Sequence, residues 1–235
     1  MWRENIAHVL FSARLPGLST SFEKEPAGSE KEGYLSRPSR LLLPLAGILL
    51  LLTCVLAWQG SPFSWEIQLS SWIHRVQGPG VGWILRAVSW IGSGAVPFML
   101  IPLLAFVLWK TGLPGRAWVL LAGAGGVSLT NLTLKHLIDR PRPGGKLFPA
   151  YIDLDSPGFP SGHVVLFVTC FGYLILLAWK HLSGSLRTVV TGGLAFLILA
   201  VGISRVWLGV HWPLDCVGGF LLGTLMVGAM WRHSG

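Results

Sequence analysis

Charged residues are scarce in this sequence: Asp, Glu, Lys and Arg make up 12% of its 235 residues, about half of the ~25% typical of a soluble domain. Hydrophobic residues make up 52%, and the mean hydropathy is +0.61. This composition excludes a disordered chain, a coiled coil and a basic nucleic-acid-binding domain. It predicts a single-domain membrane protein with several spans.

Cysteine and acidic residues are also few. The three cysteines, Cys54, Cys170 and Cys216, lie far apart in apolar stretches, which excludes a disulfide framework and a CxxC metal site. There are 10 acidic residues against 18 Lys and Arg, giving a net charge of +8. We interpret this excess as cations at span ends near anionic lipid headgroups, and we expect no nucleic-acid partner.

The first 40 residues differ from the rest because they hold 11 charged residues, against 17 in the following 195. Apolar residues at helical spacing in Met1–Arg14 predict a short helix on the membrane surface. Ser19–Arg40 is rich in Gly, Pro, Ser and charge, which is typical of a flexible linker. No apolar core with a cleavage site is present, so we expect no cleavable signal peptide. We therefore expect a flexible or amphipathic segment over 1–40 and a membrane domain over 41–235.

Six segments approach the ~20 apolar residues that a membrane span needs. We therefore predict an all-α bundle of six transmembrane helices, with Trp at the ends of five of them, where amphipathic rings prefer to lie. The predicted spans are Leu41–Trp58, Ala87–Trp109 (with a Gly/Pro-interrupted start), Ala117–Ile138, Ser161–Trp179, Arg187–Trp207 and Pro213–Trp231.

An interfacial helix is predicted between the first and second spans. Its apolar face carries Trp65, Leu69, Trp72, Ile73 and Val76. Glu66, Ser70, Ser71 and His74 fall elsewhere, and the Gly-Pro-Gly at 78–80 ends the helix. An irregular loop is the alternative.

Polar residues near the apolar core all fall on one side of the membrane if the six spans alternate in direction. Ionisable groups cost ~2.5–3.5 kcal/mol each near the bilayer centre, so a group of them on one side predicts a functional site. Taken singly, each is explained by snorkelling or by local pairing. The residues are Lys135, Arg140, Arg142, Ser161, His163, Arg205, His211 and Asp215.

Within the third span, Ser128, Asn131 and Lys135 are spaced i, i+3, i+7 and share one helix face. That stripe is expected to face the bundle interior and to position Lys135. Ordinary hydrogen bonding by Ser128 and Asn131 between helices is the alternative.

Three of these residues, Lys135, Arg142 and Arg205, are cations without a matching number of acids nearby. Converging cations favour an anion, and the planar guanidinium fork suits phosphate oxygens. Ser161 is a good N-cap for the fourth span, whose first N–H groups favour a bound phosphate. Gly162 lets the backbone come close to such a group.

The two histidines have separable roles. Asp215 follows His211 by four residues, and a carboxylate on Nδ1–H would leave Nε2 of His211 free as a nucleophile. His163 would protonate the leaving oxygen. A zinc site is the competing use of these residues, but the sequence has no HExxH and the nearby cations would repel a metal. We expect neither a metal nor another cofactor.

Three motifs resemble those of the phosphatidic acid phosphatase type 2 superfamily, which includes membrane lipid phosphatases and vanadium haloperoxidases. They are K-x6-R-P at Lys135–Pro143, P-S-G-H at Pro160–His163 and S-R-x5-H-x3-D at Ser204–Asp215. The resemblance covers about Pro97–Trp231 and does not include residues 1–40.

The resemblance implies that His211 forms a phosphohistidine, that Asp215 orients it and that His163 is the general acid. The residues implied to bind the phosphate are Lys135, Arg142, Ser161, Gly162 and Arg205. Arg140 has no family role that we can assign; a second phosphate or headgroup contact and a solvated charge are both open.

Six spans favour a membrane lipid phosphatase over a soluble haloperoxidase. The size is similar to that of bacterial phosphatidylglycerophosphate phosphatases of the B type and undecaprenyl pyrophosphate phosphatases. The expected partners are thus the bilayer and a lipid phosphate: phosphatidylglycerophosphate, phosphatidate or undecaprenyl pyrophosphate. A lipid phosphotransferase with the same site is the alternative, followed by an anion-conducting protein that needs no nucleophile.

The distribution of Lys and Arg bears on orientation. The side with both termini has 11 and the side with the site has 7. Without the four distal tail cations the counts are 7 and 7, and setting aside Lys135, Arg142 and Arg205 leaves 7 and 4. The positive-inside rule then favours cytoplasmic termini and an outward-facing site in the plasma membrane.

A GxxxG pair, Gly219 and Gly223, fits packing within the bundle better than a dimer interface, and the oligomeric state stays open.

Overall fold

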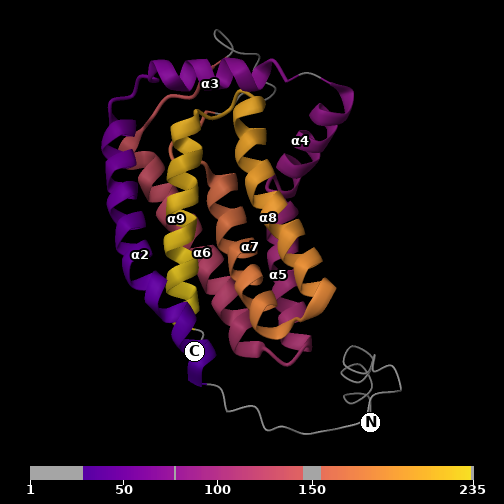
Figure 1. Ribbon diagram of the computed structural model, residues 1–235. Helices are drawn as coiled ribbons and strands as arrows, with labels where there is room; N and C mark the ends of the chain where they lie inside the picture. The colour runs from indigo at the N-terminus through magenta and orange to yellow at the C-terminus, as the bar shows by residue number, and fades with distance from the viewer. Residues whose placement is uncertain (1–28, 77, 145–154, 234–235) are drawn as a thin grey trace, which may run out of the picture.

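The computed structural model describes residues 29–76, 78–144 and 155–233, and every regular element in these ranges is a helix (Figure 1). The predicted all-α class is confirmed. Six helices stand side by side: α2 (Ser29–Trp58), α5 (Val96–Lys110), α6 (Pro114–Ile138), α7 (Gly162–His181), α8 (Gly184–Trp207) and α9 (Pro213–Arg232). Figure 1 shows α3 (Ser64–His74) lying across one end of the bundle and α4 (Pro79–Ile91) descending from it at an angle.

Five of the described helices are long and apolar enough to cross a membrane, and they match five of the predicted spans. The first membrane segment, Leu41–Trp58, has the predicted bounds. Its helix α2, however, begins at Ser29, so residues 29–40, expected as linker, form the start of this helix. Residues 1–28, including the predicted surface helix, lie outside the described residues.

The second predicted span is not one continuous helix. It consists of Gly80–Ile91 and Val96–Lys110, bent by 69°. The break has a local cause: Gly92 ends α4, Gly94 takes a positive φ of 55°, and Pro97 follows at the start of α5 without a backbone N–H to donate. If the bent pair is one span, the chain has six.

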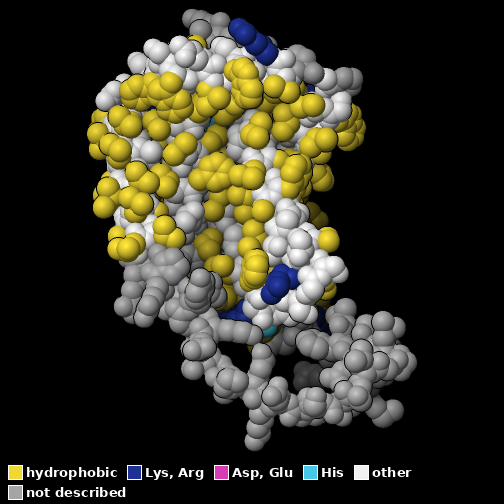
Figure 2. All heavy atoms as spheres, viewed as in Figure 1, with side chains coloured by type: hydrophobic (Ala, Val, Ile, Leu, Met, Phe, Trp, Pro, Cys, Tyr) yellow, Lys and Arg dark blue, Asp and Glu magenta, His cyan; other side chains and the backbone are white. Residues whose placement is uncertain are grey.

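The flank of the bundle is apolar. Figure 2 shows hydrophobic side chains over most of the visible face, with Lys and Arg near its ends. Leu41, Leu51 and Phe98 are among the exposed large apolar side chains, as expected for a lipid-facing surface. Cations at span ends lie over aromatic rings, with Arg187 Cζ 4.5 Å from the centroid of Trp179, and such rings prefer the membrane interface.

Helix α7 forms the centre of the bundle and packs against α6, α8 and α9. Its contact with α9 depends on the GxxxG pair. A Cβ on Gly219 would lie 2.9 Å from Cβ of Val164, and a Cβ on Gly223 would lie 2.6 Å from Cβ of Val168. These glycines therefore pack the two helices together within one bundle, as the sequence favoured.

Replacing Gly223 with Ala should lower the free energy of unfolding by about 1–3 kcal/mol, because the new methyl group overpacks the α7–α9 contact. Gly125→Ala is the matched control, since a Cβ there meets no atom within 4 Å and both variants gain the same helix propensity. Thermal unfolding of the detergent-solubilised protein measures the difference. Equal midpoints for the two variants would contradict the close packing.

Candidate active site

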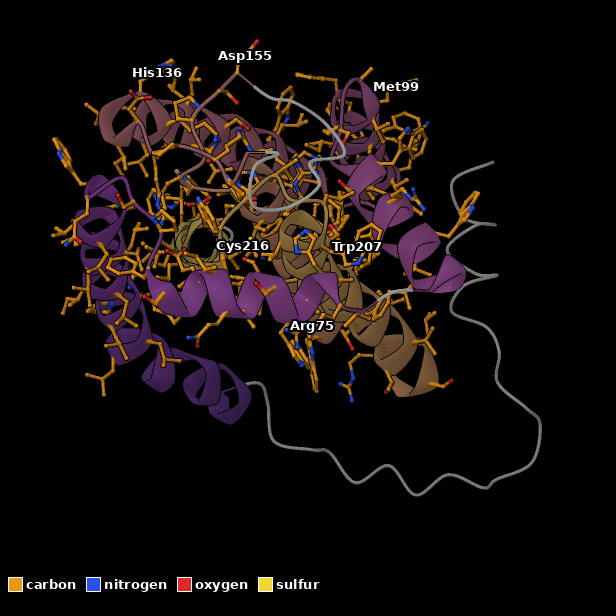
Figure 3. The ribbon with its side chains drawn as sticks, turned by 90° about the horizontal axis from the view of Figure 1, so that it is seen from above. Arg75, Met99, His136, Asp155, Trp207 and Cys216 are labelled. Atoms are coloured by element: carbon orange, nitrogen blue, oxygen red, sulfur yellow. The ribbon has the colours of Figure 1, made fainter. Side chains whose placement is uncertain are left out.

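The predicted site residues do lie together, at the end of the bundle that α3 covers. They come from the ends of α6, α7, α8 and α9 and from the adjoining loops. Seen from above in Figure 3, α3 passes beside the start of α9, marked by Cys216, and the end of α8, marked by Trp207. The residues are Lys135, Arg142, Ser161, Gly162, His163, Arg205, His211 and Asp215.

The contacts of His211 fix its tautomer. Nδ1 lies 3.3 Å from Oδ2 of Asp215, and Nε2 lies 3.1 Å from Nη1 of Arg142. A guanidinium has no acceptor, so Nε2 must accept the hydrogen bond and the proton must be on Nδ1, where the carboxylate accepts it. The lone pair of Nε2 therefore points to the cationic side of the site, as a nucleophile requires.

His211 is also kept neutral. Only 2% of its side chain is exposed, and this burial holds the pKa of His211 well below its ordinary 6.5. The positive charges of Arg142, Arg205 and Lys135 lower this pKa further. All three predicted phosphate-binding cations thus act on the same imidazole.

Asp215 is fully buried and held through both oxygens. Oδ2 accepts the backbone N–H of Trp212 at 2.9 Å as well as facing His211, and Oδ1 accepts Nη1 of Arg140 at 2.8 Å. Because Asp215 sits in the first turn of α9, the positive end of the helix dipole also favours its charge.

Lys135 and Arg142 both donate to carbonyls of the segment before P-S-G-H. Arg142 Nε donates to Ser156 O at 2.6 Å, its Nη2 donates to Pro157 O at 3.2 Å, and Lys135 Nζ donates to Pro157 O and, at 3.4 Å, to Gly158 O. These cations of the first motif therefore hold the segment that leads into α7, in addition to their effect on His211.

Four buried polar atoms at this site have no hydrogen-bond partner among the described residues: Oδ1 of Asn131, Nε of Arg140, Oγ of Ser161 and Nε of Arg205. The other end of the Arg205 guanidinium, Nη1, donates to Oγ of Ser89 at 2.5 Å. Buried polar groups are normally paired. The hydroxyl of Ser161, at the start of α7, and the guanidinium N–H of Arg205, near the end of α8, are suited to an anion.

His163 is held by the break between α4 and α5. Oγ of Ser93 donates to Ser89 O at 2.8 Å, so it accepts from Nε2–H of His163, which lies 2.9 Å away. A Cβ on Gly92 would come within 2.5 Å of Cδ2 of His163, so only glycine allows this approach. Sequence reasoning missed Ser89 and Ser93; their one signal is their position where the Gly/Pro-rich stretch interrupts the second span.

Arg140 is neither a solvated charge nor a headgroup contact. It is fully buried, and its Nη2 donates to Oε2 of Glu66 at 2.6 Å while Nη1 donates to Oε1 of Glu66 at 3.2 Å and to Oδ1 of Asp215. Glu66 is itself fully buried. Sequence reasoning missed its role, although its position as the single acidic residue of α3 was a usable signal.

The helix between the first two spans forms as predicted, with its polar side turned inward. Trp65 and Trp72 on α3 are 46% and 65% exposed, whereas Glu66 and Ser70 face the bundle and are buried. The amphipathic pattern therefore reports two environments, lipid or interface on one side and a polar site on the other.

Other sequence interpretations need correction. Ser128 is exposed and its Oγ donates to Ala124 O of its own helix, so it is not part of an inward stripe. Asn131 does face the site, where its Nδ2 lies 3.2 Å from the Cβ position of Gly162. The described residues contain no group of three or more His, Cys, Asp or Glu able to hold a metal.

The family model described as PAP2 superfamily matches residues 116–234. The chain is 35% identical over 164 residues to an Escherichia coli protein named putative undecaprenyl-diphosphatase YbjG, covering 65% of this chain and 76% of that one. It is 29% identical over 159 residues to phosphatidylglycerophosphatase B of Bacillus subtilis, covering 64% and 74%.

A solved structure shares the fold. It is the crystal structure of the first transmembrane PAP2 type phosphatidylglycerolphosphate phosphatase, from Bacillus subtilis, with a TM-score of 0.68 and 24% identity over 79% of this chain and 94% of that chain. The fold of this chain is therefore that of a known transmembrane protein.

The pKa of His211 can be measured by NMR titration of isotope-labelled histidine, with the resonance assigned by its loss in His211→Ala. The His211 signals should not move as the pH falls through 6.5, because the neutral imidazole persists below its ordinary pKa. Arg142→Gln removes a positive charge that lowers this pKa, so the transition should shift to higher pH. A wild-type midpoint at or above 6.5 would contradict the electrostatic description.

Proposed function

Since the chain belongs to the PAP2 superfamily, we propose that this multi-pass membrane protein is a lipid phosphatase that hydrolyses a phosphomonoester or diphosphate bond through a phosphohistidine on His211. The observation that carries the proposal is the pair of contacts made by His211, with Asp215 on Nδ1 and Arg142 on Nε2. An anion-binding protein without chemistry needs the cations but has no use for this pairing.

In the first half-reaction, Nε2 of His211 attacks the phosphorus atom and forms an N–P bond. The P–O bond to the leaving group breaks in line with the attack, and His163, acting as an imidazolium, gives a ring proton to the leaving oxygen and becomes neutral. Asp215 stabilises the positive charge that develops on the imidazole. The leaving group is a lipid alcohol from a monoester, or a lipid monophosphate from a diphosphate.

In the second half-reaction, water attacks the phosphohistidine and gives its proton to His163. The N–P bond breaks, phosphate is released and both histidines return to their starting forms. Nothing in these two steps requires a metal, because Lys135, Arg142 and Arg205 neutralise the charge of the transferring group and the start of α7 supplies N–H donors.

The headgroup is one of the lipid phosphates that the relatives' names suggest, a polyprenyl diphosphate or phosphatidylglycerophosphate. Arg140 does not distinguish them, since two carboxylates already neutralise it. Discrimination therefore rests with groups at the mouth of the site rather than with the cation set of the three motifs.

We also propose that the site faces the outside of the plasma membrane and that the termini are cytoplasmic. The support is the excess of Lys and Arg at the terminus side once the phosphate-binding cations are set aside.

Phosphate release by the detergent-purified protein tests the reaction, with EDTA present and with a panel of undecaprenyl pyrophosphate, phosphatidylglycerophosphate, phosphatidate and lysophosphatidate. Wild-type protein should release phosphate and His211→Ala should release none, while vanadate should inhibit. Inhibition by EDTA with no effect of vanadate would contradict the mechanism. Transfer of the phosphoryl group to an added acceptor lipid, without release of phosphate, would establish the phosphotransferase instead.

Arg205→Lys should lower kcat on the best lipid by about 10–100-fold, because a compact ammonium cannot replace a guanidinium that binds Ser89 at one end and the transferring group at the other. Arg187→Lys makes the same exchange at the other end of α8 and should retain wild-type turnover. If the two variants have equal kcat, bidentate use of Arg205 is refuted.

A further inference from the structure

We propose that Glu66 and Arg140 are positioning residues for the reaction: together they hold the carboxylate of Asp215 in the one orientation that lets it orient His211. This inference rests on the proposed function. It assigns a role to α3, a helix outside the region matched by the family model, and to a cation for which the motifs gave no role.

The three side chains form a continuous chain of contacts ending at the nucleophile. Glu66 binds Arg140 through two nitrogens, at 2.6 and 3.2 Å. Nη1 of Arg140 then reaches Oδ1 of Asp215 at 2.8 Å, leaving Oδ2 for Nδ1 of His211. Because the bidentate contact fixes the plane of the guanidinium, it also fixes the direction from which Nη1 meets Asp215.

Glu66 positions the backbone of Asp215 as well as its side chain. Its Oε1 accepts the N–H of Leu214, the residue before Asp215, at 3.0 Å, and its Oε2 accepts the N–H of Phe63 at 3.0 Å. The Leu214 N–H is in the first turn of α9, where N–H groups lack an intrahelical partner. Glu66 thus ties α3 to the start of the helix that carries Asp215.

The charges favour this arrangement over a simple Arg–Asp pair. Arg140 alone would neutralise Asp215 and weaken its attraction for the imidazolium that forms during phosphoryl transfer. A second carboxylate on the same guanidinium leaves the three-residue group with a net negative charge, and all three are fully buried, where such charges act over short distances with little screening. Asp215 is then held firmly without losing its electrostatic effect on His211.

The alternative is that Glu66 only fastens α3 to the bundle. The two roles differ in how Glu66 and Asp215 combine. If Glu66 acts through Asp215, changing Glu66 has little further effect on kcat once Asp215 is altered. If Glu66 only fastens α3, changing it lowers kcat by the same factor with and without the change at Asp215.

The test is a double-mutant cycle on the lipid that gives the highest phosphate release, with Glu66→Gln and Asp215→Asn made singly and together. Glu66→Gln should lower kcat about tenfold with KM little changed, as loss of an outer hydrogen-bond partner typically does. In the Asp215→Asn background the same change should alter kcat by less than about twofold. Arg140→Lys, which keeps the charge but loses the fork, should follow the same pattern.

Ser70→Ala is the matched control, because Ser70 lies one turn along α3 on the same buried side and contacts neither Arg140 nor Asp215. It should retain wild-type kcat. Elution profile and thermal midpoint check folding for every variant, and Glu66→Asp, which keeps the carboxylate but shortens its reach, replaces Glu66→Gln in the cycle if the latter does not fold.

Two results would overturn the inference: equal kcat for Glu66→Gln and Ser70→Ala, or the same fold-loss from Glu66→Gln with and without Asp215→Asn. Failure of the proposed function is a separate result, since it shows as wild-type protein and His211→Ala releasing equal phosphate before any Glu66 variant is compared.

Discussion

A guanidinium buried between two carboxylates is the interaction on which this end of the molecule depends. Arg140 joins α3 to α9 and lies directly after α6, so three parts of the chain far apart in sequence meet at one side chain. Removing one member of a buried ion pair typically costs about 3–5 kcal/mol, because the other charge is left without a partner. The same contacts bring Asp215 to His211, so the geometry of the site and the closure of the bundle by α3 have a common origin.

Sequence analysis predicted the site residues that belong to motifs of known spacing. The three motifs placed Lys135, Arg142, Ser161, His163, Arg205, His211 and Asp215 at one end, and hydropathy placed five spans, because both signals are local along the chain. It did not reach Glu66, Ser89 and Ser93. Their contacts are with residues 70 or more positions away, and no periodicity encodes which buried acid meets which cation. The contact between Arg140 and Glu66 could be identified only from the structure.

The break in the second span brings groups into the site that a continuous helix could not place there. A continuous helix would present side chains at regular intervals and would keep a Cβ at every position. The bend at Gly92–Gly94 instead lets backbone approach the ring of His163 and brings two hydroxyls, from Ser89 and Ser93, to Arg205 and His163 respectively. His163 is therefore held from one side by the break between α4 and α5, and the start of α9, which carries Asp215, is held from the other by α3.

The inward side of α3 has a consequence for how the catalytic unit is delimited. The match to the family model begins at residue 116, yet a fragment starting there would bury Arg140 without Glu66 and would leave Arg205 and His163 without their serine partners. In a chimera, the helices from α6 onward are therefore not an exchangeable module. A graft between two such enzymes has to carry α3 and the α4–α5 bend of the donor together with the donor's motifs, or the recipient has to supply an acid and two hydroxyls in equivalent positions.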